Sequence, residues 1–418
     1  MKKWQVLLSA AVLAAGIGFG GISQAAEPVT QVQAPTVVTV VNGEDRILGK
    51  VLGKQVIELP VFTEIDYEAG LALDAEHFGR YGCSAVAKVL PNGDMVVGRS
   101  MDLNVTNKPA YIIRTAVPGF YKTVGLAYNP FGGPDFDEAK EIGIKKIDTL
   151  PLIFFSIDIM NEKGVYIEGN MRNAENEELT GLKECRGTNP GAEWRMSPGA
   201  LIRFLGERAG SVDEAVALAK TVDVHSLKSG TLDWNAGIYI ADATGKYGIL
   251  ELVDNKLVWL PGEQLQTNFF LSRGNRDRAL YGTGLGRYET LKAGRDAVQT
   301  EKDMAKLMAL VRYSQSLDPD TCPFDVRTEY TGVHVPGIGA DDEKLTVDQA
   351  LDEANRPVLE TAIKEVMAAE RAKGLDTLKK EGQLWYSIWQ VVANCNRQSI
   401  HAMFFEDPML VYDVKVAK

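Results

Sequence analysis

The sequence predicts an α+β protein in which two antiparallel sheets are covered by helices. Four pairs of apolar segments are joined by short turns rich in Gly, Asn or Asp, which is typical of β-hairpins. Helical patterns lie between the second and third pairs and again before the last pair. Sheets with one apolar face need helices or a second sheet to bury that face.

Residues 1–25 are predicted to be a secretory signal peptide. Lys2 and Lys3 form a positive segment, Val6 to Ala15 is apolar, and small residues precede a cleavage after Ala25. The alternative is an uncleaved N-terminal anchor, which the glycine-rich run 16–21 disfavours. We therefore expect a periplasmic or secreted protein with no membrane segment once the signal is removed.

Residues 26–82 form a distinct piece before the first hairpin. Thr36 to Val41 is rich in Val and Thr, and Glu64 to Phe78 is acidic with a partly helical pattern. The four hairpins then follow in chain order. Their predicted strands and turns are Cys83 to Leu90, Asn92-Gly93 and Met95 to Leu103; Pro151 to Met160, 161–164 and Val165 to Gly169; Gly237 to Ala241, 242–245 and Tyr247 to Val253; and Trp385 to Val392, 394–396 and Ser399 to Phe405.

The predicted helices have recognisable starts. Ser197-Pro198 begins one, because Pro suits the first helical position. Ser211 to Glu214 reads as a capping box for another. Further helical patterns cover Gly284 to Ala293, Lys302 to Tyr313 and Thr346 to Ala372.

Composition narrows the function classes. The chain has 418 residues, of which 45% are hydrophobic and 24% charged, as in ordinary globular proteins. Its formal net charge of −11 makes binding of nucleic acid or an anionic membrane through bulk charge a poor hypothesis. Small-molecule chemistry and protein partners, including a homo-oligomer, stay open.

The cysteines and histidines show no metal-binding spacing, so we predict no metal and no cofactor. The four cysteines and four histidines are Cys83, Cys185, Cys322, Cys395, His77, His225, His334 and His401. If Cys83 is a nucleophile, the other three cysteines allow at most one disulfide in an oxidising compartment.

Cys83 opens the first hairpin, directly after Gly82. If Asn92-Gly93 is a two-residue loop, Cys83 lies opposite Asp102 on the return strand. A carboxylate there suits a chain cut before Cys83, because Asp102 could hold the new α-ammonium group. A free α-amine has a pKa of about 7.7–8.0, near the value of about 8.5 for a thiol, so it can accept the thiol proton without a histidine. These residues indicate N-terminal nucleophile chemistry.

Arg99 lies on the same return strand and would favour the thiolate of Cys83. In a regular strand Arg99 and Asp102 face opposite sides, so both face Cys83 only where the strand bulges or ends between them. The alternative interpretation makes Cys83 a small buried residue beside a local Arg99–Asp102 ion pair.

At these residues the sequence resembles the choloylglycine hydrolase family, the bile salt hydrolases and penicillin V acylases, and the wider linear amide C–N hydrolases. The resemblance covers most of residues 83–410, thinly between motifs. The matching segments are Gly82 to Ala85, Gly98 to Asp102, Met160 to Gly164, Val165 to Asn173, Ala241 to Gly245, Gln266 to Asn268, and Arg287-Tyr288.

The resemblance implies a fold and a reaction. The fold is an αββα four-layer sandwich, that of the N-terminal nucleophile hydrolases. The chain would cut itself before the cysteine and hydrolyse linear amides through a thioester acyl-enzyme. Residues 1–25 would then be signal, 26–82 a propeptide or small subunit, and 83–418 the catalytic domain.

The resemblance also implies site residues. Cys83 matches the nucleophile, Arg99 and Asp102 match the residues beside it, Asn268 matches an oxyanion-hole Asn, and Arg287 matches the family's active-site Arg. Asn173 matches a second oxyanion-hole residue, with Asn170 and Asn176 as competing matches. As structural alternatives, Asn268 would be a turn or bulge residue and Arg287 part of an ion pair on a helix face.

Three functions are consistent with these observations. The first is an exported, self-processing cysteine amidohydrolase acting on a small N-acyl amide. The second is an acyltransferase, because Asn268 and Arg287 are closer in sequence than in bile salt hydrolases and resemble the acyl-coenzyme A:6-aminopenicillanic acid acyltransferase group. The third is an inactive exported binding protein on this fold. Bile salts, phenoxyacyl penicillins, N-acyl homoserine lactones and N-acyl amino acids all stay open as substrates.

Overall fold

The fold is known from a computed structural model. The residues that it describes are 36–40, 46–51, 54–59, 61–67, 69, 81–103, 109–129, 141–142, 147–172, 187–225, 227–229, 232–272, 284–312, 334–339, 345–372, 386–404 and 407–416. The predicted signal peptide at 1–25 lies outside these residues.

The described strands form two large sheets and a short parallel pair, β10 (Arg195–Met196) with β11 (Asp223–Val224). The seven-stranded sheet has the order β1 (Thr36–Val40), β19 (Asp407–Lys415), β18 (Ser399–Phe404), β17 (Tyr386–Asn394), β5 (Met95–Leu103), β4 (Tyr81–Val89) and β16 (Leu265–Gln266). The ten-stranded sheet has the order β15 (Lys256–Pro261), β14 (Tyr247–Val253), β13 (Leu232–Ala241), β9 (Tyr166–Arg172), β8 (Ser156–Asn161), β7 (Thr123–Ala127), β6 (Ala110–Thr115), β3 (Lys54–Glu58) and β2 (Arg46–Val51), with β12 (Leu227–Ser229) beside β13.

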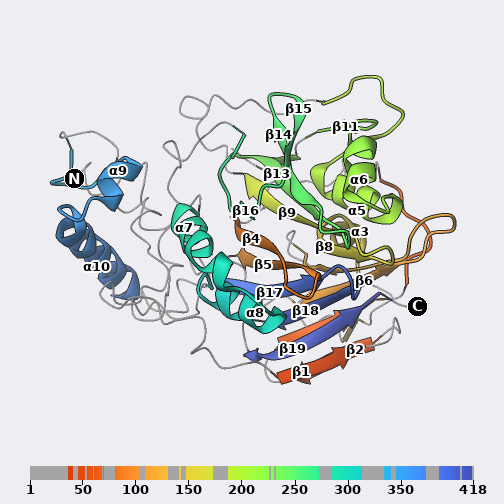
Figure 1. The fold of residues 1–418 in the computed structure, drawn as a ribbon, viewed down its shortest axis with the longest axis horizontal. Helices are drawn as coiled ribbons and strands as arrows, with labels where there is room; N and C mark the ends of the chain where they lie inside the picture. Colours follow the sequence, from red (N-terminus) through yellow and green to blue (C-terminus); the bar gives the residue numbers. More distant parts are fainter. Residues whose placement is uncertain are drawn as a thin grey trace.

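The two large sheets face each other, and helices cover their outer faces (Figure 1). Helices α5 (Pro198–Arg208) and α6 (Val212–Ala219) pack on β8, β9 and β13 of the ten-stranded sheet. Helices α7 (Leu285–Gly294) and α8 (Glu301–Ala309) pack on β4, β5, β16 and β17 of the seven-stranded sheet. The sheets meet through β4 and β9. The predicted α+β class and the αββα sandwich are therefore confirmed.

Close packing of α5 on its sheet depends on glycine. A Cβ added at Gly169 of β9 would lie 2.6 Å from Cδ1 of Ile202 on α5, and one at Gly206 of α5 would lie 2.9 Å from Ile159 on β8. The missing side chains let the helix approach the strands, while Ile202 and Ile159 fill the gap. The opposite face of β9 thus points towards the seven-stranded sheet and is where polar residues gather.

Most predicted helix starts are observed. Ser197 caps α5 by accepting a hydrogen bond from Ala200 N, and Ser211 caps α6 by accepting one from Glu214 N. The reciprocal bond of the predicted capping box differs, because Glu214 accepts from Gly210 N. Helix α8 begins as predicted and ends at Ala309, while Tyr313 lies outside the described residues.

Two predicted elements need correction. Residues expected to begin the second hairpin form the helix α3 (Leu150–Phe154), because Pro151 suits a first helical turn, and the strand starts only at Ser156. The single helix expected from Thr346 to Ala372 is two helices, α9 (Val347–Leu351) and α10 (Arg356–Ala372). A continuous helix would drive the ring of Pro357 into the Glu353 carbonyl. Of the acidic stretch from Glu64 to Phe78, the structure describes 64–67, which are not helical, and Ala69, which is in a 3-10 conformation, so the partly helical pattern stays a prediction.

The piece upstream of Cys83 is part of both sheets. Strand β1 pairs in parallel with β19 at one edge of the seven-stranded sheet. Strand β3 pairs in parallel with β6 and antiparallel with β2 in the ten-stranded sheet. Among the described residues, no helix is long and apolar enough to cross a membrane.

Candidate active site

Cys83 and Asp102 are not paired as predicted. Cys83 lies opposite Met101, and Gly82 lies opposite Asp102. The loop has three residues instead of two, since Leu90 N donates to Asp94 O at 2.8 Å and Gly93 N donates to Leu90 O at 2.9 Å. Gly93 has a φ of +89°, which fits a turn followed by a left-handed residue. The longer loop shifts the register of the hairpin by one residue.

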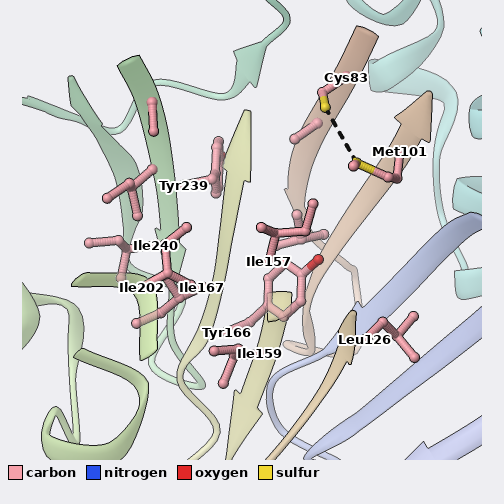
Figure 2. Packing of buried hydrophobic residues seen from close by; sticks show 14 of the residues in the cluster. Cys83, Met101, Leu126, Ile157, Ile159, Tyr166, Ile167, Ile202, Tyr239 and Ile240 are labelled. Carbon is pink, nitrogen blue, oxygen red and sulfur yellow. Dashed lines mark hydrogen bonds between the residues drawn. The ribbon is translucent and has the colours of Figure 1, made fainter. Parts of the chain in front are cut away.

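The corrected register places Arg99 on the side of the Cys83 thiol. Arg99 Nη2 lies 3.5 Å from Cys83 Sγ, and Cys83 Sγ lies 3.7 Å from Met101 Sδ. Figure 2 shows Cys83 and Met101 side by side at one end of the buried apolar cluster. Asp102 belongs to the other face of β5, so Arg99 and Asp102 approach Cys83 from opposite sides.

Two buried carboxylates hold Arg99 against the thiol. Arg99 Nη1 lies 3.3 Å from Asp158 Oδ2, and Arg99 Nε lies 3.4 Å from Glu168 Oε2. Asp158 also accepts hydrogen bonds from Tyr166 OH at 2.6 Å and from Trp389 Nε1 at 2.8 Å. The guanidinium therefore has a fixed direction.

Sequence reasoning missed Asp158 and Glu168. A signal was present, because Glu168, Asn170 and Arg172 alternate along one strand, so they share one face of the sheet. All three are fully buried. A polar row on a buried face indicates a site, since unpaired buried charges are costly.

A second row of polar groups supports Glu168. Gln266 Nε2 donates to Glu168 Oε1, and Gln266 Oε1 accepts from Arg172 Nη2 at 2.6 Å. Arg172 Nε in turn lies 3.1 Å from Glu251 Oε1. A Cβ added at Gly237 would lie 2.0 Å from Arg172 Nη2, so this position of β13 leaves room for the guanidinium.

Asp102 lies opposite Gly82, on the face of β5 away from Arg99, and contacts Arg287 of α7. Its Oδ1 accepts hydrogen bonds at 2.6 Å from the hydroxyls of both Ser100 and Ser387. Its Oδ2 lies 3.7 Å from Arg287 Nη1 and has no hydrogen-bond partner among the described residues. The buried carboxylate therefore has one oxygen without a hydrogen bond among the described residues, on the residue opposite Gly82.

Asn268 and Arg287 bind the backbone of Cys83 itself. Asn268 Oδ1 accepts from Cys83 N at 2.9 Å and from Arg287 Nη2 at 2.8 Å. Arg287 Nη1 donates to Cys83 O at 2.5 Å and to Ser84 Oγ at 2.8 Å. Asn268 Nδ2 donates to Met171 O at 2.9 Å, which leaves its second hydrogen for another acceptor.

The structure thus brings five of the six predicted site residues together: Cys83, Arg99, Asp102, Asn268 and Arg287. Asn173 lies outside the described residues, as does its competitor Asn176. Asn170 is described and fully buried, and its Nδ2 donates to Thr267 O at 3.4 Å.

Burial controls the protonation of this site. It raises the pKa of the Cys83 thiol to about 11, although the positive charges of Arg99 and Arg287 oppose the shift. Burial also raises the pKa of Asp102 to about 6 and that of Glu168 to about 8. The raised pKa of the thiol favours its protonated form at neutral pH, and the amide nitrogen of Cys83 cannot act as a base.

Two further observations concern metal binding and the other cysteines. Among the described residues, no group of three or more His, Cys, Asp or Glu side chains could hold a metal ion. Cys395 is a buried free thiol, while Cys185 and Cys322 lie outside the described residues.

Comparison with known proteins gives structural matches only. No protein-family model and no curated protein matches the chain. Two variants of a conjugated bile acid hydrolase from Clostridium perfringens are similar in structure, each with a TM-score of 0.40, 13% identity, and coverage of 80% of this chain and 92% of the other. A penicillin V acylase from Agrobacterium tumefaciens has a TM-score of 0.34, 12% identity, and coverage of 77% and 83%.

Proposed function

We propose that the protein is an exported N-terminal cysteine hydrolase of the choloylglycine hydrolase and penicillin V acylase family, which cuts its own chain before Cys83 and then hydrolyses a small N-acyl amide. One observation carries the proposal. Asn268 and Arg287 bond to the backbone nitrogen and oxygen of Cys83, while Arg99 reaches its sulfur. A structural cysteine has no use for side chains arranged around its own backbone nitrogen.

The first step is self-cleavage. Cys83 Sγ attacks the carbonyl carbon of Gly82, the Gly82–Cys83 C–N bond breaks, and the thiol proton passes to the leaving nitrogen. The product is a thioester between Gly82 and Cys83 with a free α-amine. Water then hydrolyses the thioester, which releases the carboxyl group of Gly82 and restores the thiol.

Self-cleavage creates the base that the uncut site lacks. The new α-amine has a pKa of about 7.7–8.0 in water, so it can take the proton of the Cys83 thiol. The open Oδ2 of Asp102 lies on the strand position opposite Gly82 and would accept a hydrogen bond from the ammonium form. Arg99 would stabilise the thiolate from the other side.

Substrate turnover then repeats this chemistry on an external amide. The thiolate attacks the amide carbonyl, the amine leaves with a proton from the α-ammonium, and water hydrolyses the acyl-thioester. The second hydrogen of Asn268 Nδ2 would stabilise the oxyanion, with Asn173 as the second donor implied by the family resemblance.

Two measurements test this proposal. N-terminal sequencing of the mature large chain should begin at Cys83, and Cys83→Ser should slow or abolish amide hydrolysis. Fully active enzyme with an intact Gly82–Cys83 bond would overturn it. A hydrolysis panel of bile salts, phenoxyacyl penicillins, N-acyl homoserine lactones and N-acyl amino acids would identify the substrate class.

Acyl transfer is the second function to consider. Arg287 donates a hydrogen bond to Asn268. The short separation of these two residues in the sequence resembles that in the acyltransferase group. The same thioester would then pass its acyl group to an amine instead of water. Adding an amine acceptor during turnover decides between them, because a hydrolase gives free acid and no new amide.

A further inference from the structure

We propose that the segment upstream of Cys83 stays bound after the Gly82–Cys83 bond is cut, as a small second chain that completes both sheets. This inference rests on the proposed self-cleavage and concerns the fate of the segment once the bond is broken. It is carried by four separate attachments of described residues between 36 and 67.

The first attachment is strand pairing. Strand β3 lies between β2 and β6, with Val56, Ile57 and Glu58 in parallel register with 110–112. Strand β1 pairs in parallel with β19 over five residues, Thr36 with Leu410 to Val40 with Val414. Loss of the segment would leave β6 and β19 as unpaired sheet edges.

The second attachment continues the pairing beyond β3. Leu59 N donates to Ile112 O at 3.1 Å, and Phe62 N donates to Arg114 O at 2.9 Å. Ala116 N returns a bond to Phe62 O at 2.8 Å. The upstream segment thus follows β6 along its length and beyond its end.

The third attachment is a buried apolar cluster. Ile57 and Leu59 are fully buried from solvent. They pack with five residues of the downstream chain, Tyr111, Ile113, Ala127, Ile147 and Leu152. Release of the segment would expose this cluster to water, which the hydrophobic effect opposes.

The fourth attachment is polar and has two parts. Glu58 Oε1 lies 2.8 Å from Arg114 Nε, and Arg114 Nη1 donates to Lys415 O at 2.5 Å, so one buried guanidinium joins the segment to β6 and β19. Farther along, the Arg208 guanidinium lies over the Tyr67 ring at 4.6 Å and donates to Tyr67 OH. Tyr67 OH also donates to the buried Glu207 of α5.

None of these attachments involves the cut bond. Cleavage at Gly82–Cys83 removes one covalent link and leaves the strands, the cluster and the ion pair unchanged. The segment is paired with strands of both sheets and has buried contacts with the ten-stranded sheet and with α5. We therefore expect a two-chain enzyme.

Mass spectrometry of the purified full-length protein tests the inference. Under denaturing conditions two masses are expected, for a small chain ending at Gly82 and a large chain starting at Cys83. Under native conditions they should appear as one complex with the summed mass. Active large chain alone would overturn the inference and leave the proposed function standing. A single uncut mass in active protein would overturn both.

Matched variants show whether the described contacts retain the segment. Ile57→Asn places an amide in the buried cluster, whereas Val61→Asn makes the same kind of change at a position that is 40% exposed. Ile57→Asn should raise the fraction of large chain without its partner, and Val61→Asn should not. Equal release from both variants would contradict the role of the cluster.

Hydrogen exchange covers the case in which Ile57→Asn does not fold. In the wild-type protein the amides of Leu59 and Phe62 should exchange as slowly as those of β6 on the large chain, because their bonds belong to the same ladder. Rapid exchange of Leu59 and Phe62 in protein whose β6 is protected would overturn the inference.

Discussion

Asp158 is the residue that most directly fixes the direction of Arg99. It contacts Arg99 while Tyr166 and Trp389 hold its two oxygens, and it is fully buried. Asp158→Asn keeps the size of the side chain but removes the charge. Because misplacement of a catalytic group by about 1 Å can cost about a hundredfold in rate, we expect kcat/KM for amide hydrolysis to fall by about that factor.

A positioning role for Asp158 needs a readout beyond activity. The rate of Cys83 alkylation against pH should shift in Asp158→Asn, since the thiolate loses an ordered guanidinium. Asp148→Asn is the matched control, because Asp148 is exposed and accepts a hydrogen bond from the backbone of Leu150, outside the Cys83 site. Unchanged alkylation in Asp158→Asn, with reduced stability alone, would assign Asp158 a purely structural role.

Ser387 controls the ionisation of Asp102. Burial raises the pKa of Asp102 to about 6, and the hydrogen bonds from Ser100 and Ser387 lower it. Ser387→Ala removes one bond to the charged form, which is worth about 1.5–3 kcal/mol, so the pKa should rise by at least about one unit. The acid limb of the kcat/KM profile should move to higher pH.

Ser399→Ala is the control for Ser387→Ala. Ser399 is equally buried on the neighbouring strand β18 and does not contact Asp102. A pH profile that is the same in all three proteins would show that Asp102 does not titrate in the working enzyme.

At the scale of elements, the close packing of α5 on β9 depends on the space between Gly169 and Cδ1 of Ile202. A Cβ at Gly169 would collide with Cδ1 of Ile202 alone, since the next atom is 3.9 Å away. Gly169→Ala should therefore destabilise the protein by about 1–3 kcal/mol, the usual cost of overpacking. Ile202→Val removes that same Cδ1 atom, so the double variant should recover most of the loss.

Urea unfolding of the four proteins measures this coupling. Additive losses in Gly169→Ala and Ile202→Val would contradict the packing argument. The site should respond as well, because Gly169 O accepts a hydrogen bond from Arg99 Nη2 at 3.1 Å. Shifting β9 would thus lower the activity together with the stability.

His401 joins three elements and makes their association depend on pH. Its Nδ1 lies 3.0 Å from Glu301 of α8, and its Nε2 lies 3.3 Å from Asp413 of β19. Burial lowers the pKa of His401, but hydrogen bonds to Asp413 and Glu301 outweigh it and raise the pKa to about 9. The charged imidazole is therefore favoured in the folded state.

The raised pKa of His401 sets the sign of the pH dependence. The stabilisation is fully present below the unfolded pKa of about 6.5 and is lost as the pH rises to about 9, with a magnitude of about 3 kcal/mol. Urea unfolding of the wild-type protein should show this loss between pH 6.5 and 9. His401→Gln should flatten the dependence in that range, and an unchanged slope would contradict the assignment.

Local patterns along the sequence predict much of the whole molecule. The hairpin turns, the Ser197 and Ser211 caps and the α+β class result from short-range chemistry. The family resemblance brings Cys83, Asn268 and Arg287 together, which spacing alone could not do, since Asn268 and Arg287 belong to other segments of the chain.

The errors come from choices that local sequence leaves open. Asn92-Gly93 fits a two-residue and a three-residue loop, and only the second agrees with the observed bond from Leu90 to Asp94. That choice moves Asp102 from Cys83 to Gly82. Asp158 contacts Arg99 and Ser387 contacts Asp102 only because strands distant in sequence pack together, so no motif around Cys83 predicts these contacts.

The position of β17 in the seven-stranded sheet has a consequence for timing. β17 lies beside β5 and supplies both Ser387, which binds Asp102, and Trp389, which binds Asp158. A nascent chain that still lacks β17 therefore lacks the hydrogen bond from Ser387 to Asp102 and the one from Trp389 to Asp158. If the chain cuts itself as proposed, the cut must wait until the ribosome has made nearly the whole protein. The order of synthesis would then protect the chain from being cut before it is complete.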